Sequence, residues 1–297
     1  MSHTPVLLNE SIDLLSPQKG EFFIDGTFGE GGHALAILKL VGKEGKLLAI
    51  EWDKNTLDKL IRESHQEFSG EGVIFINDNF ARLPEILEEY NLGKADGLIL
   101  DLGFSSNQLE LSGRGFSFNQ DEPLLMTYSD DSIPVYRILA RINQKDLESI
   151  IRDFGEERFA GRVARVIVER NRRGNILKSS KELAELIKNV LPRGYERGRI
   201  HPATRTFQAL RIFANKELEN LETILKNLDK IIKIGGRVAI ISFHSLEDRL
   251  VKNYFRDLGK IGKLQVFTKK PIAASDEEIM NNPRSRSAKL RAAKLIS

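Results

Sequence analysis

The chain has 297 residues, of which 41% are hydrophobic, and this is enough for one large domain or two ordinary ones with a sizeable core. It has no cysteine, which excludes disulfides, cysteine-ligated zinc and thiol catalysis. No apolar run could span a bilayer, and the N-terminus lacks the pattern of a signal peptide, so we expect a cytoplasmic protein with no membrane partner.

Charge is distributed unevenly along the chain. The net charge is only +3, but residues 152–211 carry 15 basic and 7 acidic residues, and residues 284–297 carry 5 basic residues and no acidic one. The remainder of the chain is therefore acidic. This segregation indicates a polyanionic partner, although a charged run can also be only a solvated face.

The first hundred residues alternate between short apolar runs and helical patterns. The expected strands are Phe22–Asp25, Leu47–Glu51, Val73–Ile76 and Gly97–Asp101, and the expected helices are Ala34–Leu40, Asn55–Arg62 and Leu83–Glu89. Short buried strands that alternate with helices are typical of βαβ units. The pattern therefore predicts an α/β fold with a doubly wound, mostly parallel sheet.

The alternation of short strands and helices stops after Asp101 and returns near the C-terminus. Residues 102–131 are rich in Gly, Ser and Asn, which is typical of a functional or disordered loop. The helices expected next are Glu156–Arg173, a helix from the Ser179–Glu182 capping box to Leu191, and Phe207–Ile232. They are followed by a strand at Arg237–Ser242, a helix at Leu246–Leu258, and strands at Leu264–Thr268 and Ala288–Ile296. We therefore expect a domain of residues 1–112 and 207–297, with an inserted helical domain of residues 113–206.

A glycine-rich turn, Gly26-Thr27-Phe28-Gly29-Glu30-Gly31-Gly32, follows the first expected strand and its last residue, Asp25. In doubly wound sheets, ligands bind beyond the carboxyl ends of the strands, and glycines allow the backbone to approach them closely. The spacing does not match the dinucleotide fingerprint. An acidic residue before such a turn suits S-adenosylmethionine, which has an amino acid end and a nucleoside but no pyrophosphate.

Polar residues also follow the second and third expected strands. Glu51 and Asp53 end the second strand, where a carboxylate can accept hydrogen bonds from both ribose hydroxyls. Asn77–Asn79 follow the third, and Phe80 could pack on an adenine ring. A glycine turn alone is often only a turn, and Phe80 alone fits a core position better. Together these features predict a nucleoside-binding domain.

Asp101 and Ser105 follow the fourth expected strand and are the candidate catalytic residues. In this fold their position faces the methyl group of the cofactor. Methyl transfer is an in-line displacement, so the enzyme mainly positions the nucleophile and screens charge. Acceptors that hold both N–H bonds of an exocyclic amine would orient it for attack. The alternative is an aspartate that only caps a turn.

Longer motifs then connect these features to a known family. Phe23–His33, Asp101–Gln108, Arg114–Phe118, Phe154–Arg158, His201–Gln208 and Ile241–Arg249 closely resemble the family of bacterial small-subunit ribosomal RNA methyltransferases H. The motifs run from His3–Leu8 to Asn282–Ser287, so the resemblance covers essentially the whole chain.

The resemblance implies S-adenosylmethionine-dependent methylation of the N4 amine of a cytidine in the decoding region of 16S rRNA, with the small ribosomal subunit as partner. It places the cofactor contacts on Gly31, Gly32, His33, Glu51, Phe80, Asp101 and Gln108. The family usually has Asp where this chain has Glu51, so Asp53 could share the ribose contact. Without the resemblance, a methyltransferase acting on another nucleic acid or a protein, or a non-catalytic assembly factor, stays open.

The RNA-binding candidates are arginines. Arg158, Arg162, Arg165 and Arg172 share one face of the expected helix Glu156–Arg173, which fits phosphate contacts or a solvated face. Arg205 lies in the His201–Gln208 motif, which either borders the catalytic cleft or begins a helix with Thr206 as N-cap.

The role of His244 and the oligomeric state stay open from the sequence, whereas a metal site is not expected. His244 could contact the substrate base or only fix a turn. The five histidines are widely spaced, so no metal site is predicted. A homodimer is compatible with the sequence, which does not fix the oligomeric state.

Overall fold

The computed structural model describes residues 5–63, 68, 72–103, 112–192, 194–195 and 200–297. The chain divides into two compact units. Residues 1–105 and 218–297 form the first, which we call the sheet unit, and residues 106–217 form the helical unit. None of the described helices is both long enough and apolar enough to cross a bilayer.

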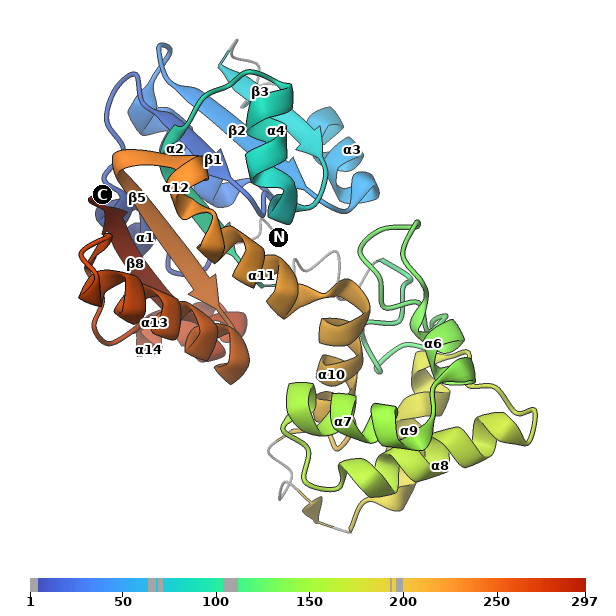
Figure 1. The fold of residues 1–297 in the computed structure, drawn as a ribbon. Helices are drawn as coiled ribbons and strands as arrows, with labels where there is room; N and C mark the ends of the chain where they lie inside the picture. Colours follow the sequence, from blue (N-terminus) through green and yellow to red (C-terminus); the bar gives the residue numbers. More distant parts are fainter. Residues whose placement is uncertain (1–4, 64–67, 69–71, 104–111, 193, 196–199) are drawn as a thin grey trace. The chain divides into compact units, whose positions relative to one another are not determined.

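The sheet unit is built on one mixed sheet (Figure 1). Its parallel part has the order β3-β2-β1-β4-β5, from β1 (Phe22–Asp25), β2 (Lys46–Glu51), β3 (Val73–Asn77), β4 (Ala95–Asp101) and β5 (Ile232–Ser242). Antiparallel strands β8 (Lys289–Leu295), β6 (Leu264–Val266) and β7 (Ile272–Ala273) extend it beyond β5. The predicted doubly wound, mostly parallel sheet is confirmed. Strand order reverses at β1, which lies between β2 and β4.

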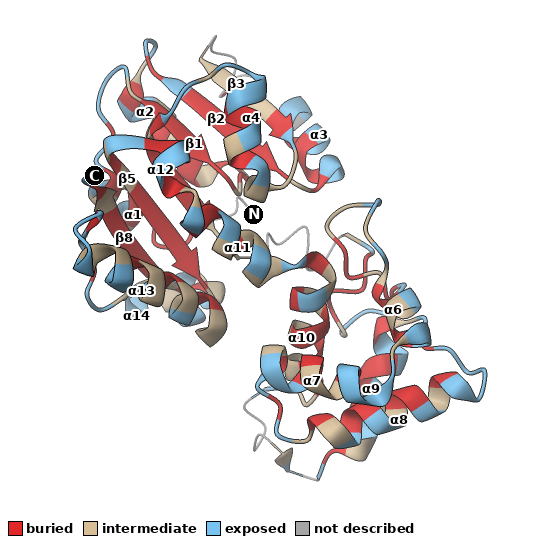
Figure 2. Ribbon diagram, viewed as in Figure 1, coloured by how far each residue is buried: buried red, intermediate tan, exposed pale blue. Residues whose placement is uncertain are grey.

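Each face of the sheet has its own hydrophobic core, because side chains alternate between the faces along each strand. Ile24 and Leu98 belong to one core, whereas their chain neighbours Phe23 and Ile99 belong to the other. The first core is covered by α4 (Leu83–Glu89), α11 (Glu217–Lys226), α12 (Leu228–Ile231) and α13 (Ser245–Lys260). The second is covered by α1 (Leu8–Leu15), α2 (Gly32–Val41) and α3 (Lys54–Glu63). The central strands β1, β2 and β4 are therefore buried almost throughout (Figure 2).

The helical unit contains α6 (Val135–Arg141), α7 (Gln144–Gly155), α8 (Ala160–Arg172), α9 (Ser180–Val190) and α10 (Thr204–Asn215). The sequence reading of Glu156–Arg173 as one helix is wrong at its start. Glu156 is left-handed, with φ of 49°, so α7 ends there and α8 begins only at Ala160. The Ser179 N-cap of α9 is confirmed, because its side chain accepts the hydrogen bond of the Glu182 N–H.

The prediction of a single helix over Phe207–Ile232 is also wrong, because this segment contributes to three separate helices, α10, α11 and α12. The break after α10 falls at Lys216, which has a left-handed φ of 52°. Thr206 is not the N-cap, since α10 starts at Thr204 and the Thr206 side chain is fully buried. Because α10 packs against α7, the units divide at 217/218 rather than at 206/207, and at 105/106 rather than at 112/113.

Candidate active site

Three carboxylates meet at the carboxyl edge of the parallel sheet. Asp25, Glu51 and Asp101 are the last residues of β1, β2 and β4, which are adjacent strands. Asp25 and Glu51 are buried, with 2% and 6% of their surface exposed, whereas the Asp101 side chain is 19% exposed. The charges of Glu51 and Asp101 both act on Asp25. The arrangement favours a cationic group at this edge.

Backbone N–H groups from the glycine-rich turn compensate part of this charge. Glu51 Oε2 accepts a hydrogen bond from Gly29 N (3.0 Å), and Asp25 Oδ1 accepts one from Thr27 N (3.1 Å). Gly29 and Gly31 have positive φ angles of 53° and 78°, which residues with a side chain rarely adopt. The glycines therefore allow the backbone to bend so that its N–H groups reach the carboxylates.

The N-terminal segment lies over the glycine turn. A Cβ atom on Gly32 would overlap the Pro5 ring, so Gly32 is the residue that lets Pro5 pack here. His33 Nε2 donates a hydrogen bond to the Val6 carbonyl (3.0 Å), and Leu7 N donates to Glu278 Oε1 (2.8 Å) in α14 (Asp276–Asn281). Sequence reasoning assigned Gly32 to cofactor approach and missed this contact, since nothing local links Pro5 with Gly32.

The turn-capping role considered for Asp101 is visible in the structure. Its N–H donates to Thr27 Oγ1 (2.6 Å), and its Oδ1 accepts from Gly103 N (3.2 Å), which fixes the turn after β4. Its other oxygen, Oδ2, faces His33 Nδ1 at 4.0 Å. Because a carbonyl only accepts, the His33 ring carries a hydrogen on Nε2. Asp101 itself is held by the hydrogen bonds at its N–H and its Oδ1.

Of the residues expected to contact the nucleoside, Glu51 and Phe80 lie beside the glycine turn, and Asp53 lies at the start of α3. Glu51 remains beside the glycine turn, and Phe80, the first residue of η1 (Phe80–Arg82), lies against Gly26, whose added Cβ would be 3.3 Å from the Phe80 Cβ. The carboxylate of Asp53, by contrast, accepts hydrogen bonds within its own chain segment. Its Oδ1 accepts from Asn55 N (3.0 Å) and its Oδ2 from Thr56 Oγ1 (3.2 Å), at the start of α3. Both Glu51 oxygens accept backbone hydrogen bonds as well, Oε2 from Gly29 N (3.0 Å) and Oε1 from Asp53 N (2.9 Å).

Burial raises the pKa of two of the carboxyl groups. The pKa of Asp25 rises from 3.8 to about 7, mainly through loss of hydration and further through the charges of Asp101 and Glu51. The pKa of Glu51 rises from 4.5 to about 7 for the same main reason. Both groups are therefore partly protonated near neutral pH, and a bound cation would drive them toward the ionised form.

One shallow pocket connects the turn, Asp101 and the C-terminal part of the sheet unit. Its lining includes Pro5, Gly32, His33, Asp101, Phe243 and Arg284. Sequence reasoning did not single out Phe243 or Arg284, although each lies in one of the motifs. Two predicted residues, Ser105 and Gln108, lie outside the described part of the chain.

His244 has the turn-fixing role that the sequence left open. It is the N-cap of α13, and its Nδ1 accepts a hydrogen bond from Glu247 N (3.4 Å). The Glu247 carboxylate in turn accepts from His244 N (3.3 Å) and Phe243 N (2.9 Å). This reciprocal capping box fixes the chain directly after β5.

The predicted RNA-binding arginines lie in the helical unit, and their surroundings differ. Arg158, Arg162, Arg165 and Arg172 are all exposed. The Arg158 guanidinium lies over the rings of Phe159 (5.0 Å) and Tyr195 (5.3 Å), and Arg165 is 4.0 Å from Glu169. Arg162 and Arg172 have no ion-pair partner among the described residues. These two are therefore the freest cations of the set.

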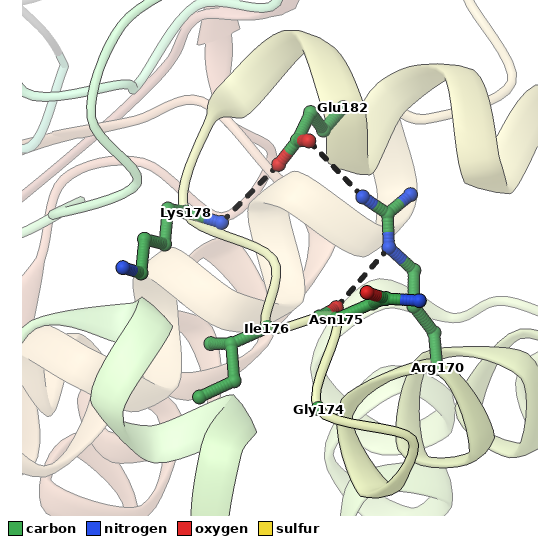
Figure 3. A pocket seen from close by; sticks show the side chains of 6 residues that line it. All are labelled: Arg170, Gly174, Asn175, Ile176, Lys178 and Glu182. Carbon is green, nitrogen blue, oxygen red and sulfur yellow. Dashed lines mark hydrogen bonds and ion pairs between the residues drawn. The ribbon is translucent and has the colours of Figure 1, made fainter.

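Two other arginines brace the helical unit. Arg205 Nη1 donates to the Glu156 carbonyl (3.0 Å), which holds the end of α7. Arg170 donates to the Asn175 carbonyl (3.3 Å) and to Glu182 Oε1 (3.1 Å), which ties α8 to the start of α9 (Figure 3). For Arg205, a structural role is therefore visible beside the predicted RNA contact.

Comparison with known proteins identifies the family. The model of the MraW methylase family matches residues 1–296. The chain belongs to this family. The protein named Ribosomal RNA small subunit methyltransferase H from Syntrophus aciditrophicus is 41% identical over 310 residues, covering 99% of this chain and 98% of the relative. The protein of the same name from Halothermothrix orenii is 37% identical, covering 100% and 99%. Among solved structures, Aeropyrum pernix fibrillarin with bound S-adenosyl-L-methionine shares 10% identity with a TM-score of 0.42, covering 93% of this chain and 67% of that chain.

The raised pKa values predict how stability depends on pH. Between about pH 4 and 7 the folded protein holds protons on Asp25 and Glu51 that the unfolded chain has lost. The free energy of unfolding should therefore fall as the pH rises through this range and level off above it. Asp25→Asn should make the fall in the free energy of unfolding between pH 5 and 8 smaller, on the order of 1–3 kcal/mol. Urea unfolding at pH 5, 6, 7 and 8 measures this difference. The exposed Glu44→Gln serves as control, and an unchanged pH profile in Asp25→Asn would contradict the account.

Proposed function

We propose that this protein transfers a methyl group from S-adenosylmethionine to the N4 amine of a cytidine in the decoding region of 16S rRNA. The observation that carries the proposal is the position of Asp101, at the end of β4 and beside the glycine turn, in a chain of the MraW methylase family. The full-length relatives named Ribosomal RNA small subunit methyltransferase H support the substrate class.

The sheet unit would hold the cofactor at its carboxyl edge. Gly31 and His33 border the methionine end, Glu51 accepts the ribose hydroxyls, and Phe80 packs on the adenine. When bound, the cofactor supplies a methyl group on a positively charged sulfur that is already a good leaving group. The buried carboxylates of Asp25 and Glu51 suit this charge.

Asp101 would position the acceptor amine. The lone pair of the cytidine N4 is delocalised into the ring, so the amine attacks well only when it is oriented and beginning to lose a proton. Asp101 Oδ1 accepts from Gly103 N, whereas Oδ2 lies 4.0 Å from Nδ1 of His33, and both residues line the pocket. Oδ2 can accept an amine hydrogen and take up the proton that leaves after the new N–C bond forms.

The helical unit would bind the rRNA. Its segment 152–211 holds 15 basic and 7 acidic residues, and the exposed arginines of α8 supply cations for phosphates. We expect the substrate to be 16S rRNA within the small subunit, in the cytoplasm.

The role of Glu51 can be tested on cofactor binding alone. Glu51→Ala should weaken S-adenosylmethionine binding by roughly 10- to 100-fold, because a hydrogen bond to a charged acceptor contributes about 1.5–3 kcal/mol. Glu51→Asp, which keeps the carboxylate, should bind much more tightly than Glu51→Ala. Calorimetric titration measures both affinities, and wild-type affinity in Glu51→Ala would remove Glu51 from the site.

The role of Asp101 can be tested on turnover. Asp101→Ala should lower methyl transfer to small ribosomal subunits by at least about 100-fold, since it removes both the acceptor and the fixed turn. Asp101→Asn keeps an oxygen for Gly103 N but not the negative charge, and it should also be severely impaired. Cofactor affinity is measured in parallel. A folded Asp101→Ala protein with unchanged turnover and cofactor affinity would reduce the residue to a turn cap.

The role of the α8 arginines can be tested by salt titration of RNA binding. The double variant Arg162→Gln/Arg172→Gln should bind the subunit more weakly, with a salt slope shallower by somewhat under one unit per lost contact. The charge-matched control Lys145→Gln/Lys181→Gln removes exposed cations from α7 and α9 of the same unit. Equal slopes in the two double variants would mean that the α8 face is only solvated.

A further inference from the structure

The direction of β8 brings a second chain segment to the candidate site. β8 runs antiparallel to β5, with Ser242 opposite Lys289, whereas β4 runs parallel to β5, with Asp101 opposite Ile241. The beginning of β8, and not its end, therefore lies at the carboxyl edge of the sheet. The segment directly before it, η3 (Pro283–Ser287), is delivered to the same edge as Asp101.

Arg284 is presented there by a fixed turn. The fully buried Ser285 holds the turn, because both its N–H (3.0 Å) and its Oγ (2.8 Å) donate to the Asn282 carbonyl. Ala288 N closes it by donating to the Ser285 carbonyl (2.9 Å). Arg284 lines the pocket that also contains Asp101 and His33. It is the only arginine or lysine among the described residues of that lining.

Phe243 brings an aromatic ring to the same pocket. A Cβ on Gly103 would lie 2.6 Å from the Phe243 Cε2 and 3.1 Å from Asp101 Oδ1, so the ring, the turn and the carboxylate are in close contact. The Phe243 backbone is held by the α13 capping box through its hydrogen bond to Glu247. A ring, a carboxylate and a guanidinium thus line one pocket, each on a fixed piece of backbone.

We propose that the part of this pocket lined by Phe243 and Arg284 is the acceptor-nucleotide subsite, next to the part lined by Gly32 and His33 that borders the cofactor. There Phe243 packs against the target base and Arg284 pairs with a phosphate next to it. The proposal rests on the proposed RNA methylation. An aromatic face stacks on a base, Asp101 accepts the amine hydrogen, and a guanidinium matches phosphate geometry.

Charge explains why a cation is needed at this place. Asp25, Glu51 and Asp101 lie at one edge, and each of them that is ionised repels a phosphate that approaches Asp101 together with the target base. A phosphate beside the pocket is therefore costly unless a positive group offsets it. Arg284 is placed to do this within the sheet unit, independently of the α8 arginines.

The test compares Arg284→Gln with Arg286→Gln, which removes the same charge from an exposed residue of the same turn that does not line the pocket. For Arg284→Gln we expect the KM for small ribosomal subunits to rise about tenfold or more, with S-adenosylmethionine affinity within about twofold of wild type. Arg286→Gln should leave both values near wild type. Intact cofactor binding also shows that the variant is folded.

Phe243 is tested by Phe243→Leu and Phe243→Tyr under the same conditions. Loss of the ring should lower kcat/KM for the subunit about tenfold, and Phe243→Tyr should restore most of it, because the stacking face returns. The proposal is overturned if Arg284→Gln behaves like Arg286→Gln, or if it mainly weakens cofactor binding, which would assign Arg284 to the carboxylate of the cofactor. Absence of methyl transfer by the wild-type protein would instead overturn the proposed function.

Discussion

The site depends on keeping three carboxylates together in a partly dehydrated place. Parallel pairing puts Asp25, Glu51 and Asp101 at the ends of adjacent strands, and burial penalises their charge. The turn after β1 offsets part of the penalty, because Thr27 N donates to Asp25 and Gly29 N, at a positive φ, donates to Glu51. The remaining negative charge at this edge favours a bound cation. When no cation is bound, Asp25 and Glu51 are partly protonated near neutral pH. The raised pKa values of Asp25 and Glu51 thus follow from the burial of these carboxyl groups at neighbouring strand ends.

The parallel sheet and its edge were predictable because their signals are local. Apolar runs fix the strands, and a strand that ends in an acidic residue places that residue at the edge, as for Glu51 and Asp101. The strand bounds of β1 were predicted to the residue. By contrast, the helix breaks at Glu156 and Lys216 could not be predicted, since neither is a glycine, although both have positive φ. Tertiary packing of α7 with α8 and α10 decides these breaks.

Contacts between distant parts of the sequence account for the rest of what sequence reasoning missed. The packing of Pro5 on Gly32 and the delivery of Arg284 beside Asp101 depend on chain ends that meet only in the folded sheet unit. The local role of Asp53 was also missed, because its oxygens accept hydrogen bonds from Asn55 and Thr56 at the start of α3. Composition likewise does not separate Arg170 and Arg205, which brace the helical unit, from the exposed Arg162 and Arg172.

The central claim is that this site methylates a cytidine amine of 16S rRNA. The most direct measurement is mass spectrometry of nucleosides and of the decoding-region fragment of 16S rRNA, from cells with and without this protein. The account predicts an N4-methylated cytidine that is absent without the protein and is restored by the wild-type chain but not by Asp101→Ala. Identical modification of the fragment in cells with and without the protein would contradict it.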